Sequence, residues 1–254
     1  NLLIGKTLDL NDLKKMGFKA VFIGSGAGLP KFMNLPGEDL NGVYSANEYL
    51  TRINLMKAYQ FPLYDTPIKK ANKIAVIGGG NVAMDAARTA LRLGAEKVIL
   101  IYRRTEKEMP ARKEEVEHAK EEGIKFMMQT NPLEFIGDTI IKQIKCIKMT
   151  MDKTTDASGR SCPKAIPNSE FLLDVDQAII ALGTTPNPII GQAHKELKKN
   201  PNGTLLVDDT YMTSIPSIFA GGDVVTGAAT VITALAAGQK AASAIIKYTK
   251  KRIN

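Results

Sequence analysis

The stretch IAVIGGGNVAMDAARTALRLGAEKVILIY, residues 74–102, decides the fold class. An apolar run leads into three glycines, and a segment follows whose apolar residues recur about every 3.6 positions. A second apolar run, EKVILIY, then closes the stretch. A strand, a helix and a second strand within about thirty residues predict a parallel βαβ unit. Strands and helices alternate in the same way along much of the chain, which favours an α/β protein with a parallel sheet.

The glycines after the first of these strands form a GxGxxA motif, made of Gly78, Gly79, Gly80, Asn81, Val82 and Ala83. Gly78 allows a tight turn, and Gly80 has no side chain to keep a pyrophosphate from the backbone. Ala83 lets the helix lie close to the strand. Phosphates would then meet the free N–H groups at the helix N-terminus, so the motif predicts dinucleotide binding. The alternative is a glycine turn that binds nothing.

Two arginines, Arg103 and Arg104, follow the second strand, twenty and twenty-one positions after Ala83. An NAD site has an acid at about this distance, which accepts hydrogen bonds from the ribose 2′-hydroxyl. Glu96 is the nearby acid, but it lies at the start of the strand. A guanidinium pair would instead bind a 2′-phosphate, so the sequence favours NADP(H) over NAD(H). A solvated strand end is the alternative.

A second apolar strand that ends in glycines occurs in FAGGDVVTGAATVITAL, residues 219–235. Asp223, after Gly222, could accept from a sugar or ribitol hydroxyl. The following helix is expected to begin at Thr230 and Val231, where its dipole would stabilise negative charge on a bound ring system. Glycine–aspartate turns also occur in purely structural loops, and that reading stays open here.

Other segments predict the remaining elements. Residues 110–123 predict a charged helix with Pro110 in its first turn and Gly123 at its C-terminal cap. Alternation with a period of two over residues 124–151 predicts an antiparallel ribbon, with residues 154–169 as its loop. A long helix is expected over residues 229–248.

Composition limits the classes of function. The chain has 254 residues, 44% of them hydrophobic, and a net charge of +8 that is raised by the C-terminal segment KYTKKRIN, which is expected to be a solvated helix end. No apolar run is long enough for a membrane span, and aromatic residues are too sparse for a nucleic-acid platform. Two isolated histidines and two cysteines sixteen positions apart predict neither a metal site nor a CxxC redox pair. A reducing cytoplasm is expected. The first residue, Asn1, suggests a processed or truncated chain.

Together, these motifs resemble the NADPH-dependent glutamate synthase small (beta) subunit family, which includes the large subunit of NADH-dependent ferredoxin:NADP oxidoreductase and related sulfide dehydrogenase subunits. The resemblance spans nearly the whole chain, and the segments that carry it are VFIGSGAGLPKFMNLPGEDLNGVYSANEYL, IAVIGGGNVAMDAARTALRLGAEKV, YRRTEKEMPARKEEVEHAKEEGI, AIIALGTTPNP and SIFAGGDVVTGAATVITALAAGQKAA. It implies two Rossmann-like dinucleotide-binding domains of the three-layer β/β/α type. A NADPH domain, residues 63–184, would be inserted in a partial FAD domain made of residues 1–62 and 185–254.

The resemblance also implies roles for individual residues. Gly222 and Asp223 would contact the pyrophosphate and ribitol of FAD, and Thr230 and Val231 would lie beside the flavin N1/O2 edge. The strand-end turns at the domain crossings would be the segments Gly24, Ser25, Gly26 and Gly183, Thr184. Glu115 resembles an acid that meets the nicotinamide carboxamide in distant relatives, with Glu114 and a plain solvated helix face as alternatives.

The activity implied is that of an NADPH-dependent flavoprotein oxidoreductase, in which hydride passes from NADPH to FAD without a catalytic side chain. Electrons would continue through iron–sulfur clusters of an N-terminal domain that this chain lacks, toward a glutamate synthase large subunit or a ferredoxin-type electron-transfer subunit. Thioredoxin-reductase-like disulfide chemistry is disfavoured, because no CxxC is present. The first FAD motif is also missing, so a non-catalytic NADP-binding fragment with an empty flavin half-site is the alternative.

Overall fold

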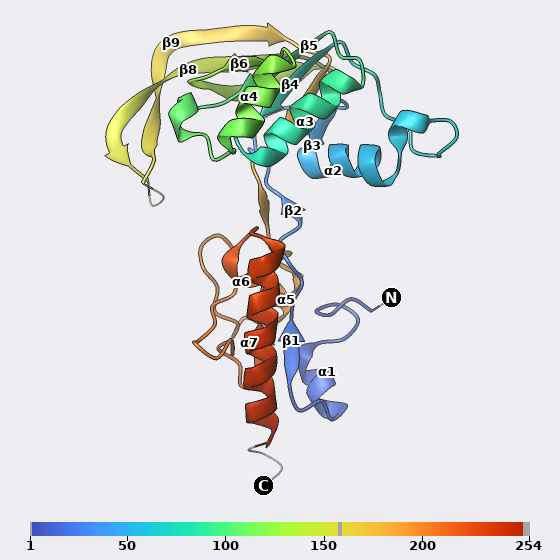
Figure 1. Ribbon diagram of the computed structural model, residues 1–254, viewed down its shortest axis with the longest axis vertical. Helices are drawn as coiled ribbons and strands as arrows, with labels where there is room; N and C mark the ends of the chain where they lie inside the picture. Colours follow the sequence, from blue (N-terminus) through green and yellow to red (C-terminus); the bar gives the residue numbers. More distant parts are fainter. Residues whose placement is uncertain (1, 157–158, 251–254) are drawn as a thin grey trace. The chain divides into compact units, whose positions relative to one another are not determined.

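The computed structural model describes residues 2–156 and 159–250 of the chain. The chain forms two compact units (Figure 1). The flanking unit consists of Asn1–Leu29 and Thr184–Asn254, and the inserted unit is Pro30–Gly183. In chain order the inserted unit interrupts the flanking unit, and the assignment of the two units as NADPH and FAD domains stays a prediction.

The first boundary between the units differs from the expected one near residue 62. Residues 30–62 pack with the inserted unit, because β3 (Val43–Ser45) pairs with β10 (Gln177–Ile180) at the edge of its sheet. Helix α2 (Ala46–Leu50) then buries Ala46 and Tyr49 in the same core. The second boundary, at residues 183 and 184, lies within one residue of the expected position.

A five-stranded parallel sheet is the centre of the inserted unit, with the strand order β3-β10-β4-β5-β6. Residues 74–102 form β4, α3 and β5, as predicted. In chain order the remaining elements of this unit are η1 (Thr51–Leu55), η2 (Ala58–Gln60), β4 (Lys73–Ile77), α3 (Asn81–Arg92), β5 (Lys97–Ile101), η3 (Glu106–Glu108), α4 (Lys113–Glu121), β6 (Lys125–Met127), β7 (Thr130–Gly137), β8 (Ile141–Thr155) and β9 (Ser161–Asp174).

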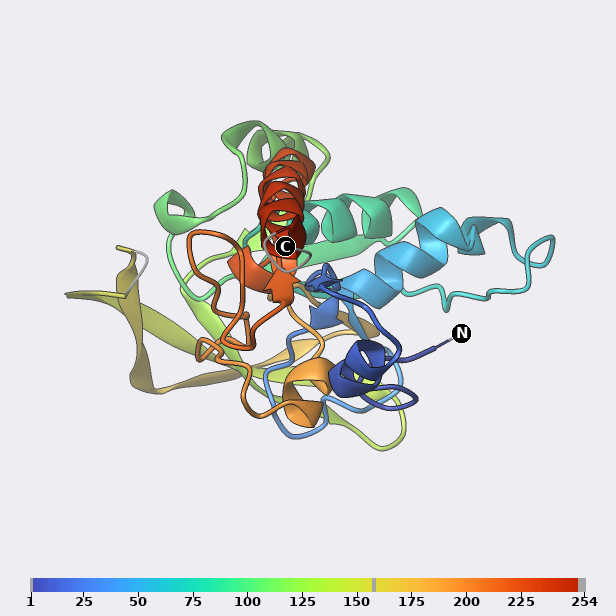
Figure 2. The same cartoon turned by 90° about the horizontal axis from the view of Figure 1, so that it is seen from below.

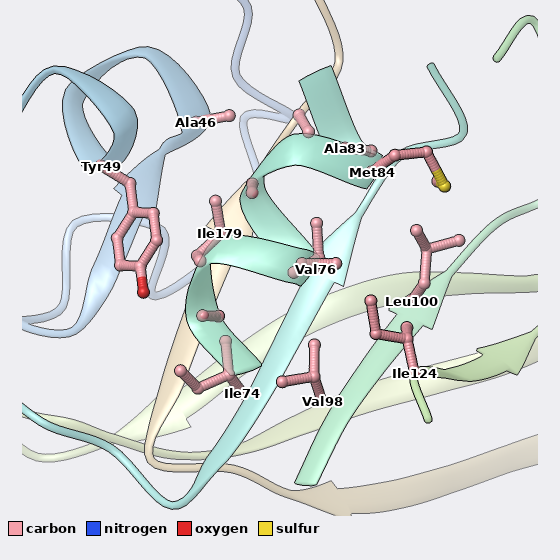
Figure 3. Close-up of a cluster of buried hydrophobic side chains, with 14 of the residues drawn as sticks. Ala46, Tyr49, Ile74, Val76, Ala83, Met84, Val98, Leu100, Ile124 and Ile179 are labelled. Carbon is pink, nitrogen blue, oxygen red and sulfur yellow. The ribbon is translucent and has the colours of Figure 1, made fainter. Parts of the chain in front are cut away.

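Each face of this sheet has its own hydrophobic core, because successive strand residues point to opposite sides. On one face, Ile74, Val76 and Ile179 meet the small residues of α3, as Figure 3 shows. Alanines at 83, 86, 87 and 90 are fully buried, so the helix can lie close to the strands. On the other face, Ala75, Ile77 and their neighbours pack against the antiparallel sheet β7-β8-β9. The predicted three-layer β/β/α arrangement is thereby confirmed.

The antiparallel ribbon is longer than predicted. Residues 161–169, expected to be loop, form the first part of β9, and β8 runs to Thr155. Pro163 and Pro167 suggested a loop, but β9 is an edge strand, and edge strands tolerate proline because one of their sides has no ladder bonds to lose. Residues 157 and 158 of the expected loop lie outside the described residues. The long strands β8 and β9 run side by side and extend beyond the parallel sheet (Figures 1 and 2).

The charged helix α4 also begins later than predicted. Its N-cap is Arg112, so Pro110 precedes the helix and does not occupy its first turn. Its end is as expected: Gly123 has a φ of +94°, and its N–H donates to the carbonyl of Lys120 at 2.9 Å. Glycine tolerates this left-handed conformation, which closes the helix.

The flanking unit is built on two parallel strands, β1 (Val21–Ile23) and β12 (Ile218–Ala220). Ile23, Leu197, Leu205 and Ile218 belong to its core. The C-terminal helix α7 (Val231–Lys250) matches the predicted helix. The last four residues of the expected solvated helix end, 251–254, lie outside the described residues. The other elements of this unit are α1 (Leu10–Lys15), β11 (Thr184–Thr185), α5 (Ile189–Ala193) and α6 (Asp223–Thr226). Strand β2 (Leu29–Pro30), which pairs with β11, spans the boundary between the units.

Candidate cofactor-binding site

The glycine turn after β4 joins the strand to α3, and packing requires its first two glycines. Gly78 has a φ of +148°, and a Cβ there would lie 2.3 Å from the carbonyl oxygen of Ala181. A Cβ on Gly79 would lie 2.7 Å from the ring of Tyr102. Both distances are far below van der Waals contact, so these two glycines let the turn lie against β10 and the end of β5.

Gly80 is different, because its lack of a side chain leaves open space. Its φ of −94° and ψ of 176° suit any residue, and the atom closest to an added Cβ would be Pro110 Cγ at 3.9 Å. Gly80 is the N-cap of α3, and no side chain caps the helix. The exposed first turn, with Asn81 and Val82, therefore presents backbone N–H groups and the positive end of a twelve-residue helix to this space.

The remaining motif residues pack against the sheet or form hydrogen bonds with the segment before α4. Ala83 is fully buried against the sheet, as its predicted role requires. Asn81 Oδ1 accepts the Arg112 N–H at 2.9 Å, and the Ala111 N–H donates to the carbonyl of Gly79 at 3.1 Å. The segment from the arginines to α4 is thus fastened to both sides of the turn. Sequence reasoning missed these contacts, because no local pattern indicates which backbone groups a loop will meet.

The two arginines after β5 have different environments. Arg103 is exposed, and it forms no ion pair within the described part of the chain. Arg104 is 3% exposed; its Nη2 lies 2.6 Å from Asp156 Oδ2, and its Nε donates to the carbonyl of Ser161 at 2.9 Å. Successive residues leave the strand on opposite sides, so one arginine faces solvent and its neighbour fastens the β8–β9 ribbon. Glu96 precedes β5 at the opposite end, as expected.

Glu115 takes part in an ion-pair network between α3 and α4. Its Oε2 accepts from Arg88 at 2.8 Å, and Arg88 and Arg92 both reach Glu122, at 2.8 and 2.7 Å. Hydrogen bonds from Arg92 and Arg88 hold the pKa of Glu122 below its ordinary value. The alternative of a plain solvated helix face thus fits Glu114, which is exposed, but not Glu115. The sequence did not predict roles for residues 88, 92 and 122, because their ion-pair partners are 27 to 34 positions away.

In the flanking unit, strand pairing brings two of the predicted segments together. Ile23 pairs with Ala220, so the turn of Gly24, Ser25 and Gly26 begins beside the Gly221–Gly222 turn. The Gly221 N–H donates to the carbonyl of Ile23 at 3.2 Å. Gly26 and Gly222 have φ values of +70° and +74°, which favour glycine.

Asp223, the first residue of α6, is half-buried, and its carboxylate makes no hydrogen bond or ion pair among the described residues. The N-terminus of α7 is also open. Thr230 Oγ1 accepts the Thr233 N–H at 3.3 Å, and Val231 is 84% exposed. The apolar Ile232 is exposed beside it.

The predicted turn at Gly183 and Thr184 lies at the second boundary between the units. Gly183 has a φ of +83°, and its carbonyl accepts the Lys31 N–H at 3.0 Å. Thr184 begins β11. Gly183 and Thr184 therefore lie where the chain passes from β10 to β11, and their part in cofactor binding stays a prediction.

Across residues 2–156 and 159–250, no cluster of three or more His, Cys, Asp or Glu side chains could hold a metal ion. Both cysteines are free. No helix in the same residues is long and apolar enough to cross a membrane.

The fold and the glycine turns define a protein with two nucleotide-binding units of the Rossmann type. The family model of the pyridine nucleotide-disulphide oxidoreductases matches residues 3–238, and the chain belongs to this family. In fold, it is similar to FprA from Mycobacterium tuberculosis, with a TM-score of 0.80, 19% identity and coverage of 99% of this chain and 68% of that one. Thioredoxin reductase from T. acidophilum gives a TM-score of 0.65 at 22% identity, over 92% of this chain and 66% of that one.

Curated relatives confirm the resemblance seen in the sequence. The chain is 36% identical to the glutamate synthase [NADPH] small chain of Azospirillum brasilense, over 99% of this chain and 53% of the relative. It is 37% identical to the NADP(+)-dependent formate dehydrogenase subunit beta of Moorella thermoacetica, over 99% of this chain and 34% of that protein. The chain thus spans between about a third and about half the length of these relatives.

Proposed function

We propose that this chain is the nucleotide-binding part of an NADPH-dependent flavoprotein oxidoreductase similar to the glutamate synthase small chain. The observation that carries the proposal is the open helix N-terminus at Gly80. An added Cβ would meet nothing closer than 3.9 Å there, whereas Gly78 and Gly79 are closely packed. A turn that served packing alone would need no open third glycine.

The inserted unit is proposed to bind NADPH. The pyrophosphate would lie on the N–H groups of the first turn of α3, where the helix dipole favours negative charge. Arg103, exposed and without an ion pair among the described residues, would bind the 2′-phosphate. Arg104 is engaged by Asp156 and Ser161, so 2′-phosphate selection rests on Arg103, and Arg104 would position the ribbon beside it. Glu115 is held by an ion pair with Arg88. Glu115 could contact the nicotinamide carboxamide only if that ion pair broke.

The flanking unit is proposed to hold part of an FAD site. Its residues fit such a ligand: Gly222 adopts a left-handed conformation beside an open turn, and the Asp223 carboxylate is left without a partner in the described residues. The carboxylate would accept from ribitol hydroxyls, and the Thr230–Val231 end of α7 would stabilise negative charge through its dipole. A bound flavin supplies the hydride acceptor for reduced nicotinamide. No side-chain acid is needed for that transfer, so the residues named here bind and orient.

Electrons are proposed to leave through iron–sulfur centres of a longer protein or of a partner subunit. Several relatives are named as subunits: the glutamate synthase small chain, the formate dehydrogenase subunit beta and the NADPH-Fe(3+) oxidoreductase subunit beta of Geobacter sulfurreducens. Such names support a partner that carries electrons, of the glutamate synthase large-subunit or ferredoxin type.

The nicotinamide nucleotide is tested by substituting Arg103. In R103A, the ratio of NADPH to NADH affinity, measured by calorimetry, is expected to fall about 10- to 150-fold. This fold-change corresponds to the loss of about 1.5–3 kcal/mol, the contribution of a hydrogen bond to a charged group. K97A is the matched control: it removes one exposed positive charge from the other end of the same strand, and the ratio should not move. An unchanged ratio in R103A would refute the assignment of the 2′-phosphate.

Flavin binding is tested separately on the purified chain, by its absorbance after reconstitution with FAD. Bound flavin that NADPH bleaches under anaerobic conditions supports the proposal as a whole. A colourless chain that still prefers NADPH would refute flavin binding by this chain and favour the alternative, a non-catalytic NADP-binding module.

A further inference from the structure

A cavity of about 390 Å³ lies in the inserted unit, away from the glycine turn. It is lined by the starts of β4 and β10, by α2 and η2, and by the last turn of α3. Ile74, near the start of β4, forms part of its wall, whereas Gly78 follows the other end of the same strand. The cavity is therefore at the opposite edge of the sheet from the proposed NADPH site. Its volume lies in the range of small-molecule sites.

The polar feature of this cavity is Gln177, the first residue of β10. Ala178 and Ile180 belong to the core on the ribbon side of the sheet, and Ile179 belongs to the core on the helix side. Strand alternation therefore directs Gln177 to the helix side, toward the cavity that it lines. The residue is 1% exposed, and within residues 2–156 and 159–250 neither its Nε2 nor its Oε1 has a hydrogen-bond partner. Buried amides are rarely left unpaired, because both of their polar atoms lose water without compensation.

A second polar group lies on the wall of the same cavity. Tyr49 is 2% exposed, and its hydroxyl forms no hydrogen bond within the described residues. Figure 3 shows the ring extending from α2, with its hydroxyl at the end far from that helix. Burial raises the pKa of Tyr49, so the hydroxyl stays protonated and can both donate and accept.

The mouth of the cavity is cationic and aromatic. Lys69 and Lys70 line it, are exposed, and form no ion pair among the described residues. Tyr59 and Phe61 are 55% and 54% exposed there. Arg92 also contributes, although Glu122 already neutralises it. Unpaired lysines beside exposed rings suit a planar ligand that carries an acidic group.

We propose that this cavity binds a small anionic heterocycle of the nucleoside monophosphate type. A carboxamide presents one donor and one acceptor side by side, so Gln177 would pair with a ring edge that carries an adjacent N–H and carbonyl. Tyr49 would supply a further hydrogen bond, and Lys69 and Lys70 would bind the phosphate. A purely apolar ligand would leave the amide unpaired, and inorganic phosphate alone would not reach it.

The test uses the full chain saturated with NADP⁺, so that the glycine turn is not free to bind the probe. Uridine 5′-monophosphate and guanosine 5′-monophosphate, both with the required ring edge, are titrated by calorimetry. At least one is expected to bind, and Q177L should weaken it at least tenfold. Uridine without its phosphate should bind more weakly than uridine 5′-monophosphate, and a K69A/K70A variant should remove that difference.

Melting temperature provides the control for folding. Q177L should melt no lower than the unsubstituted chain, because leucine removes an unpaired amide from an apolar wall. Q177M provides a second apolar side chain if Q177L melts lower, and the same loss of binding is expected. The inference is overturned if neither monophosphate binds, or if Q177L and Q177M bind as tightly as the unsubstituted chain. Because NADP⁺ binding is measured first, failure at this cavity is distinguishable from failure of the proposed function.

Discussion

The neighbouring arginines should respond to substitution in opposite ways. Arg104 is 3% exposed and makes two charge-assisted hydrogen bonds, to Asp156 and to the carbonyl of Ser161. Removing one member of a buried ion pair costs about 3–5 kcal/mol, mostly because the other charge loses its partner. The Asp156 side chain is 29% exposed, and its Oδ2 lies 3.9 Å from Arg160 Nη2. Solvent and Arg160 therefore offset part of the cost when Asp156 loses Arg104. We expect R104M to destabilise the inserted unit by about 3 kcal/mol.

Methionine is the chosen replacement, because it keeps most of the aliphatic stem that packs in the fold. R103M is the matched control. Since Arg103 is exposed and unpaired in the described residues, its substitution should change stability by less than about 0.5 kcal/mol.

Native-state hydrogen exchange is the suitable measurement, because the chain has two units that need not unfold together. The buried amides of Leu100 and Ile101 in β5 report on the inserted unit. A loss of about 3 kcal/mol would accelerate their exchange roughly 150-fold in R104M and hardly at all in R103M. Unchanged exchange in R104M, together with a lost preference for NADPH, would show that Arg104 is a ligand-binding residue and refute this division of roles.

Three further results are expected. G79A should lower the melting temperature, because its Cβ would lie 2.7 Å from a tyrosine ring. G80A should melt normally, yet calorimetry should show that it binds NADPH at least tenfold more weakly. The reverse pattern would contradict the geometry of the turn. Glu122 has a folded-state pKa below its ordinary 4.5, so its contribution to stability is present above that pH and is lost as the pH falls through the folded-state pKa. E122Q should therefore flatten the acid limb of a urea-midpoint profile, and an unchanged limb would exclude this linkage. Burial raises the pKa of Cys146 to about 12, so a thiol reagent should label Cys162 alone in the native chain, and rapid double labelling would contradict that burial.

The parallel core could be predicted from the sequence because its signals are local. The strand, glycine turn and helix of residues 74–92 carry their periodicity within a single βαβ unit, and the structure reproduces it. The end of α4 at Gly123 could be predicted equally well, since a left-handed cap is a local requirement.

Long-range pairing was not accessible in the same way. Residues 161–169 look like loop by composition, and only their position at a sheet edge makes them a strand that tolerates proline. The boundary near residue 62 was wrong as a limit of the compact unit for a similar reason, because β3 joins its sheet through β10, more than 130 positions away. The sequence could not distinguish Arg104 from Arg103, because the Asp156 that pairs with Arg104 comes from the distant β8–β9 ribbon.

The alternation of Arg103 and Arg104 has a consequence for how cofactor preference could change during evolution. One residue faces solvent and the other closes a buried junction, so substitutions at the two adjacent positions should have separate consequences. If Arg103 binds the 2′-phosphate as proposed, position 103 could exchange its arginine for an acid or a neutral residue without disturbing the ribbon, and single substitutions there would shift the preference between nicotinamide nucleotides. Position 104 has no such freedom, because each change must be matched at Asp156. An engineer seeking NADH specificity would therefore vary residue 103 and leave its neighbour untouched.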